Sequence, residues 1–328
     1  MNFTFDHRGL CQSLVWLIET LPPRKARYIL ISNQLGLYYA KRCMDGYVSP
    51  KLLQLFGGYF RDLLREYRKA IHTIEFLNNL LNKVNLEYIY IKTYRPLPYV
   101  PNDIDLFIDT KDIPNLMKLL KNNGFKISKH GVEMRCYKKG MTRIDIYTSI
   151  VYSGIEFNIK DLIFSTKVSV KFFDNCNIFI PSPDLDALIL LLHDILGHRT
   201  INYLDYLYIK HALFQNPFSN VLQNILNSDR RGVEVIKRCL ALFSSLSFKG
   251  RLDNVADFPL MIRPSFVLNI LGDISFHKRI LYGSSLFIDN FLRLYNIYNN
   301  IIPPELKTIV QTALFYHRLL VGDRHTNL

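Results

Sequence analysis

The chain has no closely spaced cysteine pair and no long apolar run. Its five cysteines lie at positions 11, 43, 136, 176 and 239, and none forms a Cys-x-x-Cys pair. This argues against a disulfide framework or a zinc cluster and favours reduced, buried thiols. No stretch reaches the roughly 18 consecutive apolar residues of a membrane-spanning helix, and the first residues lack a signal-peptide pattern. We therefore expect a cytoplasmic protein without a membrane partner.

Glycine and proline are scarce as well, with 15 and 14 of the 328 residues. Such low numbers exclude a collagen-like or proline-rich chain. Hydrophobic residues make up 49% of the sequence, which excludes a disordered chain because it supplies enough apolar surface to offset the entropy of ordering. The length suits about two packed domains at roughly 100–200 residues each.

Acidic residues are few relative to basic ones, 28 against 41, which gives a formal net charge of +13. A basic protein favours polyanionic partners, such as nucleic acid or nucleotide phosphates. The excess is densest in residues 1–85, where one helical face carries Arg61, Arg65, Arg68 and Lys69. This face is either a solvated basic surface or a contact surface for a phosphate backbone.

Three regions follow from the patterning of apolar residues. Residues 1–85 and 182–328 show helical spacing, whereas residues 86–181 alternate in the manner of strands. The predicted class is therefore α+β, with a small sheet module flanked by helical regions. The expected helices are 10–20, 24–43, 50–83, 112–122, 184–196, 202–214, 218–227, 231–244, 259–270, 284–297 and 304–321. The expected strands are 86–91, 103–108, 125–129, 132–137, 142–148, 167–171 and 177–180.

Three aspartates in this module carry the chemical signal. Asp103 and Asp105 are two residues apart on a predicted strand, so both side chains point to the same face. Asp145 interrupts another apolar strand and joins them if the two strands are neighbours. Three carboxylates on one face repel each other unless a cation binds them, and Mg²⁺ prefers oxygen ligands. The alternatives are a solvated strand end for the pair, and an ion pair with Arg143 or Arg135 for Asp145.

These residues resemble the nucleotidyltransferase fold of the DNA polymerase β superfamily, and most closely its uncharacterised family in bacteria and archaea. The similarity runs from Ile91-Lys92-Thr93 through Asp103-Ile104-Asp105-Leu106 to Arg143-Ile144-Asp145-Ile146, and includes Asn123-Gly124-Phe125. It covers roughly residues 86–212. The resemblance implies a polymerase-β-like module in which Asp103, Asp105 and Asp145 are the catalytic residues and hold two Mg²⁺ ions, or Mn²⁺ in their place.

The turn after the first strand departs from the superfamily pattern. Where the pattern has Gly-Ser or Gly-Gly close to the triphosphate, this chain has Lys92-Thr93. Some members of the similar family carry a lysine here, so the resemblance implies that Lys92, Thr93 and Arg95 bind the nucleotide, the two basic residues by charge. The alternatives are a surface lysine for Lys92 and a turn role for Thr93.

Three polar residues receive structural interpretations. Asp109 is expected to cap the helix that follows it. His193 and His198 lack the spacing of a zinc pair and are expected to pack between helices, although a position of His193 facing the site is the alternative.

Together these features predict an enzyme, a nucleotidyltransferase. It would transfer a nucleoside monophosphate from a nucleoside triphosphate to an acceptor in RNA (including tRNA), in a protein or in a small molecule. The alternative is a catalytically inactive protein of the same fold that binds nucleic acid or protein.

Overall fold

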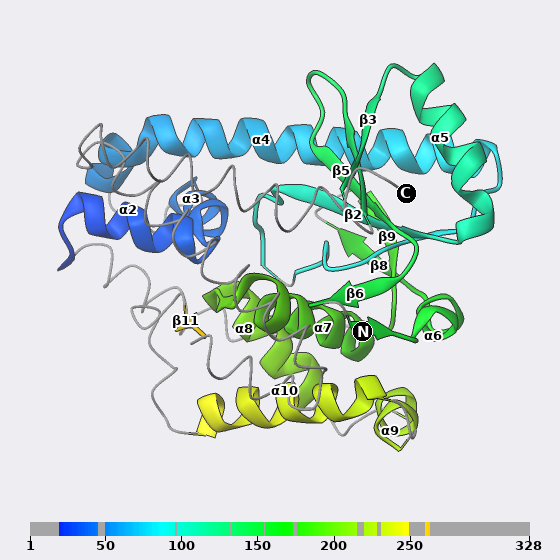
Figure 1. Ribbon diagram of the computed structural model, residues 1–328. Coiled ribbons are helices and arrows are strands. Elements are labelled where there is room, and N and C mark those ends of the chain that lie inside the picture. The colour runs from blue at the N-terminus through cyan, green and yellow to red at the C-terminus, as the bar shows by residue number, and fades with distance from the viewer. Residues whose placement is uncertain are drawn as a thin grey trace, which may run out of the picture.

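The computed structural model describes residues 20–44, 50–95, 97–130, 133–153, 155–172, 176–214, 220–227, 231–248 and 260–262. They form a mixed α+β protein in which a small sheet lies between a long helix and a group of shorter helices (Figure 1). This confirms the predicted class.

A five-stranded mixed sheet is the centre of the fold. Its order is β1-β2-β5-β4-β3, and β2 and β5 are parallel while the other neighbours are antiparallel. The strands are β1 (Tyr88–Tyr90), β2 (Asp103–Ile108), β3 (Lys126–His130), β4 (Glu133–Tyr137) and β5 (Arg143–Tyr147). The expected strands 103–108 and 142–148 are thus confirmed, and they are neighbours.

The long helix α4 (Pro50–Lys83) runs along one side of the sheet (Figure 1). Its buried side chains recur every three or four residues because that spacing keeps them on one helical face: Phe56, Phe60, Tyr67, Ala70, Ile74, Leu77 and Leu81. Two polar residues of this helix contact the module. Thr73 accepts a hydrogen bond from the backbone N–H of Thr142 at 2.9 Å, and Asn78 accepts one from the hydroxyl of Tyr90 at 2.8 Å.

The predicted helix 24–43 is wrong as a single helix. The structure has α2 (Pro23–Ser32) and α3 (Gly36–Met44), separated at Asn33 and Gln34, where Gln34 adopts a left-handed φ of 56°. Asn33 is buried, and its side-chain oxygen accepts the backbone N–H of Tyr203 at 3.1 Å. A partner 170 residues away therefore occupies the break, which local spacing cannot reveal. Residues 10–19 of the expected first helix lie outside the described residues.

The helix α5 (Ile113–Asn122) ends as predicted. The N–H of Phe125 bonds to Leu120 O and that of Gly124 to Lys121 O, with Gly124 at a φ of 81°. A 3₁₀ turn, η1 (Thr110–Asp112), precedes the helix, and Asp109 caps this turn by accepting the N–H of Lys111. The remaining elements of the module are β6 (Ile150–Tyr152), β7 (Ile155–Phe157), α6 (Lys160–Ser165), β8 (Val168–Phe172) and β9 (Cys176–Ile180).

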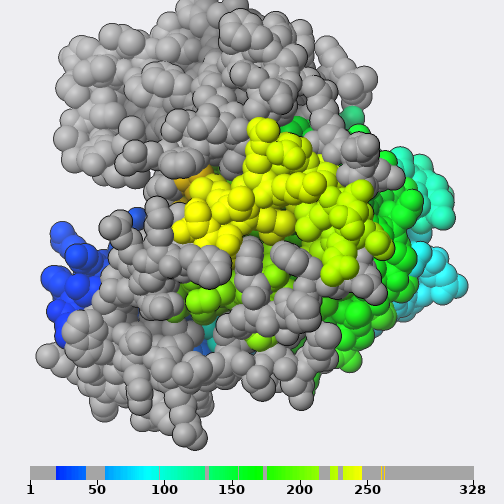
Figure 2. Space-filling model, turned by 90° about the horizontal axis from the view of Figure 1, so that it is seen from below, coloured from blue at the N-terminus to red at the C-terminus, as the bar shows by residue number. Residues whose placement is uncertain are grey.

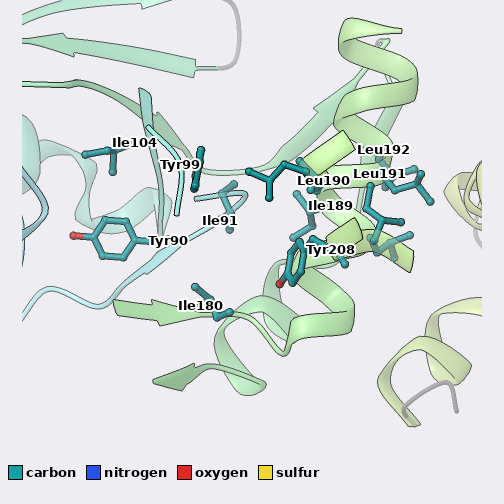
Figure 3. Packing of buried hydrophobic residues seen from close by; sticks show 14 of the residues in the cluster. Tyr90, Ile91, Tyr99, Ile104, Ile180, Ile189, Leu190, Leu191, Leu192 and Tyr208 are labelled. Atoms are coloured by element: carbon teal, nitrogen blue, oxygen red, sulfur yellow. The ribbon is translucent and has the colours of Figure 1, made fainter. Parts of the chain in front are cut away.

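The helices on the other side of the sheet are α7 (Pro183–Leu192), α8 (Tyr203–Ile209), α9 (Asn220–Leu226) and α10 (Arg231–Phe248). Figure 2, seen from below, shows α10 in yellow across this face, over the green of the preceding helices. Residues 185–192 of α7 are all buried, and Figure 3 shows Ile189 and Leu190 packed toward Ile91 and Tyr99 of the sheet side.

Two predicted helices end in wider turns. The expected 184–196 is α-helical only to Leu192 and then forms a π-helical turn, η2 (His193–His198). The expected 202–214 likewise ends in η3 (Lys210–Phe214). The expected helix 259–270 is wrong at Leu260–Met261, because β11 (Leu260–Met261) pairs with β10 (Thr200–Ile201). Residues 263–270, 284–297 and 304–321 lie outside the described residues.

Three of the five cysteines lie in the part of the chain that the structure describes. Cys136, Cys176 and Cys239 are free and buried, and burial raises the pKa of Cys136 to about 12, so this thiol is not a nucleophile at neutral pH. Among the described helices, none is both long and apolar enough to cross a membrane.

Candidate active site

The parallel pairing of β2 with β5 brings the three aspartates together. Asp105 lies directly opposite Asp145, and Asp103 lies opposite Arg143. Side chains at facing positions of neighbouring strands point to the same side, so Asp103, Asp105 and Asp145 share one face of the sheet. Burial is graded along this triad: Asp145 and Asp105 are buried, whereas the side chain of Asp103 is 29% exposed.

Arg143 bridges two members of the triad. Its guanidinium bonds to Asp103 and, at 2.9 Å, to Oδ2 of Asp145. The ion pair that the sequence left open as an alternative for Asp145 is therefore present. Oδ1 of Asp145 is buried and has no hydrogen-bond partner. Burial first, and then repulsion by Asp103, raise the pKa of Asp145 to about 6, although Arg143 acts in the opposite direction.

Lys92 pairs with the third member. Its Nζ lies 3.1 Å from Oδ1 of Asp105, and the two side chains are 3% and 10% exposed, which excludes the surface-lysine alternative. Burial, the largest single effect, lowers the pKa of Lys92, but the interactions with Asp105, Tyr152 and Asp103 together outweigh it and the net pKa is raised. The backbone of Lys92 is left-handed, with φ of 56°, and its N–H donates to Asp186 at 2.7 Å.

The rest of the turn is held by internal bonds. The hydroxyl of Thr93 donates to Ile91 O at 3.1 Å and accepts the N–H of Asp105 at 3.2 Å, as a turn residue does. Arg95 forms a buried ion pair with Asp205 and donates to Lys92 O at 2.7 Å. Of the three residues expected to bind nucleotide, only Lys92 directs its charge at a carboxylate of the triad, Asp105. Nucleotide binding by Lys92, Thr93 and Arg95 stays a prediction.

The available ligands are of the chemical type that binds a divalent cation such as Mg²⁺. It offers three carboxylates on one face and a buried carboxylate oxygen, Oδ1 of Asp145, that lacks a partner. In the described part of the chain, however, no three His, Cys, Asp or Glu side chains are already grouped to hold a metal ion. Arg143 lies between Asp103 and Asp145, so metal binding there requires this guanidinium to move away.

A cavity of about 490 Å³ opens over the triad. Residues of all three predicted regions line it: Ser32 and Gln34 from the N-terminal region, the aspartates and Lys92 from the sheet module, and Leu190, His193, Asp194, His198, Thr200, Asn202 and Asp205 from the C-terminal region. The volume lies within the range of small-molecule pockets.

The π-helical turn η2 forms the wall opposite the sheet. His193, Asp194 and His198 all line the cavity, so the alternative of a site-facing His193 is the one observed. The rings of His193 and His198 meet edge to face, with centroids 4.3 Å apart. Asp194 is 3% exposed, and its Oδ2 has no hydrogen-bond partner. Burial raises the pKa of Asp194 well above its usual value and lowers that of His193.

Sequence reasoning missed four acidic residues of the site. Asp186 supports the Lys92 turn, Asp205 neutralises Arg95, and Glu133 accepts the hydroxyl of Tyr147 at 2.9 Å and pairs with Arg135. Asp194 is the fourth. For Asp186 and Asp194 the available signal was their position within the apolar run of residues 184–196, where charged residues are rare unless they are paired.

Comparison with known proteins leaves the family open. No family model and no curated protein sequence matches the chain. Among solved structures, the chain is similar to the lincosamide antibiotic adenylyltransferase LnuA, crystallised with lincomycin bound, at 16% identity and a TM-score of 0.32. The match covers 43% of this chain and 94% of that one. A TM-score this low does not establish a shared fold, so the function has to be argued from the site itself.

Proposed function

We propose that the protein is a metal-dependent nucleotidyltransferase with a polymerase-β-like active site. The main support is the register of β2 and β5, which sets Asp105 opposite Asp145, with Asp103 on the same face. All three side chains line the cavity. Asp105 and Asp145 are 40 positions apart in the sequence, so local structure alone does not bring the carboxylates together. Clustering carboxylates costs free energy, which Lys92 and Arg143 offset within the protein, and such clusters occur preferentially at functional sites.

In this proposal Asp103, Asp105 and Asp145 hold Mg²⁺. The bound ions would supply positive charge to the attacking and leaving oxygens of phosphoryl transfer. Arg143, once displaced from Asp103 and Asp145, is placed at the cavity to bind a phosphate oxygen, since guanidinium groups match phosphate well. Lys92 orients Asp105 through its 3.1 Å contact and favours the ionised carboxylate, although burial makes the net pKa of Asp105 higher than usual.

In this proposal the Lys92-Thr93 turn takes the place of the glycine turn of the superfamily. Glycine would allow the backbone to approach a phosphate, whereas Lys92 adopts the same kind of left-handed conformation and adds a charge. The strain of a non-glycine residue there costs about 1 kcal/mol or more. The buried contact with Asp105 and the bond to Asp186 hold the residue in this conformation.

A calorimetric titration tests the proposal. Mg²⁺ complexes of ATP, GTP, CTP and UTP are added to the wild type, to the wild type with EDTA, and to Asp103→Asn, whose partly exposed position makes it the least disruptive triad variant. We expect at least one nucleotide to bind with Mg²⁺, and its binding to be lost with EDTA and in the variant. Binding of none of the four would contradict the proposal.

A second candidate is the inactive binding protein, and one observation favours it. Each carboxylate of the triad already has a protein cation, Lys92 for Asp105 and Arg143 for the other two. Permanent ion pairs of this kind would let the module fold without metal. This candidate predicts RNA binding that needs no metal and weakens steeply as salt is added.

A further inference from the structure

The proposed function gives no role to the π-helical wall of the cavity, η2 (His193–His198). We propose that this wall is the acceptor subsite, where an alcohol hydroxyl binds against Asp194, beside the rings of His193 and His198. The inference rests on the proposed function and adds the chemical class of the second substrate. Asp194 would be the group that takes the hydroxyl proton.

An unsatisfied carboxylate oxygen is the first observation. Oδ2 of Asp194 is buried without a hydrogen-bond partner, and the residue lines the cavity. Nδ1 of His193 lies 3.8 Å from Oδ1, the other oxygen of Asp194, which exceeds hydrogen-bond distance. Buried polar atoms are normally satisfied in native proteins, so an orphaned one at a cavity wall indicates a ligand that donates a hydrogen bond.

The pairing of the other charges singles out Asp194. In the cavity, Lys92 pairs with Asp105, Arg95 with Asp205, Arg135 with Glu133, and Arg143 with Asp103 and Asp145. Asp194 is the lining acid that none of these four cations neutralises by an ion pair in the described residues. On the sheet wall each carboxylate of the triad therefore has a protein cation, and only Oδ1 of Asp145 among their oxygens is buried without a hydrogen-bond partner. On the helical wall, Asp194 has an ion pair with none of these cations, and its Oδ2 has no partner.

The local backbone is the second observation. His193, Asp194 and His198 belong to a π-helical turn, a conformation that is rare and often occurs at functional sites. The turn ends at Arg199, whose left-handed φ of 56° reverses the chain into β10. The extra residue per turn lets both imidazoles and the carboxyl line one cavity, and places His198 in an exposed position beside the half-buried His193.

The neutral imidazole beside Asp194 suits a neutral hydroxyl donor. Among the charged neighbours, Asp205 raises the pKa of Asp194, whereas Arg95 and Lys92 lower it and also lower the pKa of His193. Burial also keeps His193 neutral at pH 7. A neutral hydroxyl that donates to Asp194 and contacts the imidazoles fits this environment.

The reaction balances with the nucleotide as co-substrate. The hydroxyl oxygen forms a bond to the α-phosphorus, and the bond between that phosphorus and the bridging oxygen breaks. Pyrophosphate leaves with the electron pair, and the hydroxyl proton passes to the carboxylate of Asp194 and then to solvent. A positioned base of this kind contributes about 10²–10⁴-fold to the rate.

Glycerol is the probe for binding. It is titrated into the wild type, with and without Mg²⁺ and a non-hydrolysable nucleotide, while the ring resonances of His193 and His198 are followed by NMR and assigned with His193→Gln and His198→Gln. We expect both rings to shift in the wild type and in Asp62→Asn, a matched change at an exposed site of α4. The shifts should be lost in Asp194→Asn, and methylammonium should produce none. Absence of shifts in the wild type, or their persistence in Asp194→Asn, would overturn the proposal.

Transfer to glycerol separates this inference from the proposed function. Asp194→Asn should bind Mg²⁺–nucleotide as the wild type does but transfer at least about 100-fold more slowly. A variant that transfers at the wild-type rate refutes the role of Asp194 and leaves the nucleotidyltransferase proposal intact. Failure of the wild type to bind any nucleotide refutes the proposed function. If Asp194→Asn does not fold, the exposed His198→Gln gives the test, with normal nucleotide binding and a weakened glycerol response expected.

Discussion

The two walls of the cavity differ in how their charges are satisfied. On the sheet wall, the carboxylates of the triad are paired with Lys92 or Arg143 from the protein itself. On the helical wall, Asp194 is buried with an oxygen that has no partner. Lys92 and Arg143 thus allow the sheet wall to fold without metal, and Arg143 must move away when a metal ion binds. The helical wall instead keeps a group available for a substrate.

The largest expected effect comes from removing a carboxylate of the sheet wall. Asp103→Asn should lower transfer at least about 10³-fold, because the lost charge is one that would stabilise the transition state. Its melting temperature should stay within a few degrees, since the side chain is 29% exposed. Pyrophosphate release and thermal unfolding provide the measurements. An equally active variant would remove Asp103 from the metal site, and Asp62→Asn is the control.

The buried ion pair makes the sheet wall sensitive to loss of its cation. Lys92→Met should lower the free energy of unfolding by about 3–5 kcal/mol, because Asp105 is left buried and uncompensated. Urea unfolding measures the change, and adding Asp105→Asn to this variant should recover part of it. Lys69→Met, which breaks a surface pair with Glu66, should cost less than about 1 kcal/mol. Equal effects of the two lysine variants would show that the buried pair is unimportant.

Arg143 tests whether protein cations and metal compete. Arg143→Gln should bind Mn²⁺ more tightly than the wild type without nucleotide, by about tenfold or more, since the metal no longer has to displace the guanidinium. Nucleotide binding should weaken in the same variant if Arg143 contacts a phosphate. Calorimetry measures both affinities, with Arg238→Gln as a control that breaks a pair with Glu234 on α10. Weaker Mn²⁺ binding by Arg143→Gln would contradict the competition.

A smaller effect follows from the pKa of Asp145, which burial and Asp103 raise to about 6. A proton on Asp145 competes with metal, so affinity should be nearly constant above pH 7 and fall as the pH drops through 6. Between pH 7.5 and 5.0 the expected loss of Mg²⁺ affinity is roughly five- to tenfold. Asp145→Asn should flatten this part of the profile. A wild-type profile without any change near pH 6 would contradict the assignment.

The strands of the site were predictable from sequence because their signals are local. Alternation along residues 103–108 and 142–148 placed each aspartate on a strand face, and the structure confirmed both strands. The sequence did not predict that these two strands are neighbours; the grouping of the three aspartates was stated only for the case that they are. It depends on β4 and α5 filling the connection, which is a property of the fold as a whole.

Other features depend on partners far away in the sequence. The break at Asn33 is occupied by Tyr203, and the strand at Leu260 exists through its pairing with Ile201. The π-helical turn at His193 also escapes periodicity, because an apolar helix pattern continues through it. The sheet wall could therefore be predicted in outline, whereas the helical wall, with Asp194 and the support of Lys92 by Asp186, could not.

The most direct test of the account is an anomalous diffraction measurement on crystals grown with Mn²⁺ and a non-hydrolysable form of the nucleotide that binds best. We predict manganese density among Asp103, Asp105 and Asp145, a triphosphate beside it, and Arg143 moved away from its position between Asp103 and Asp145. Manganese bound elsewhere, or nucleotide bound while Arg143 still bridges Asp103 and Asp145, would contradict it.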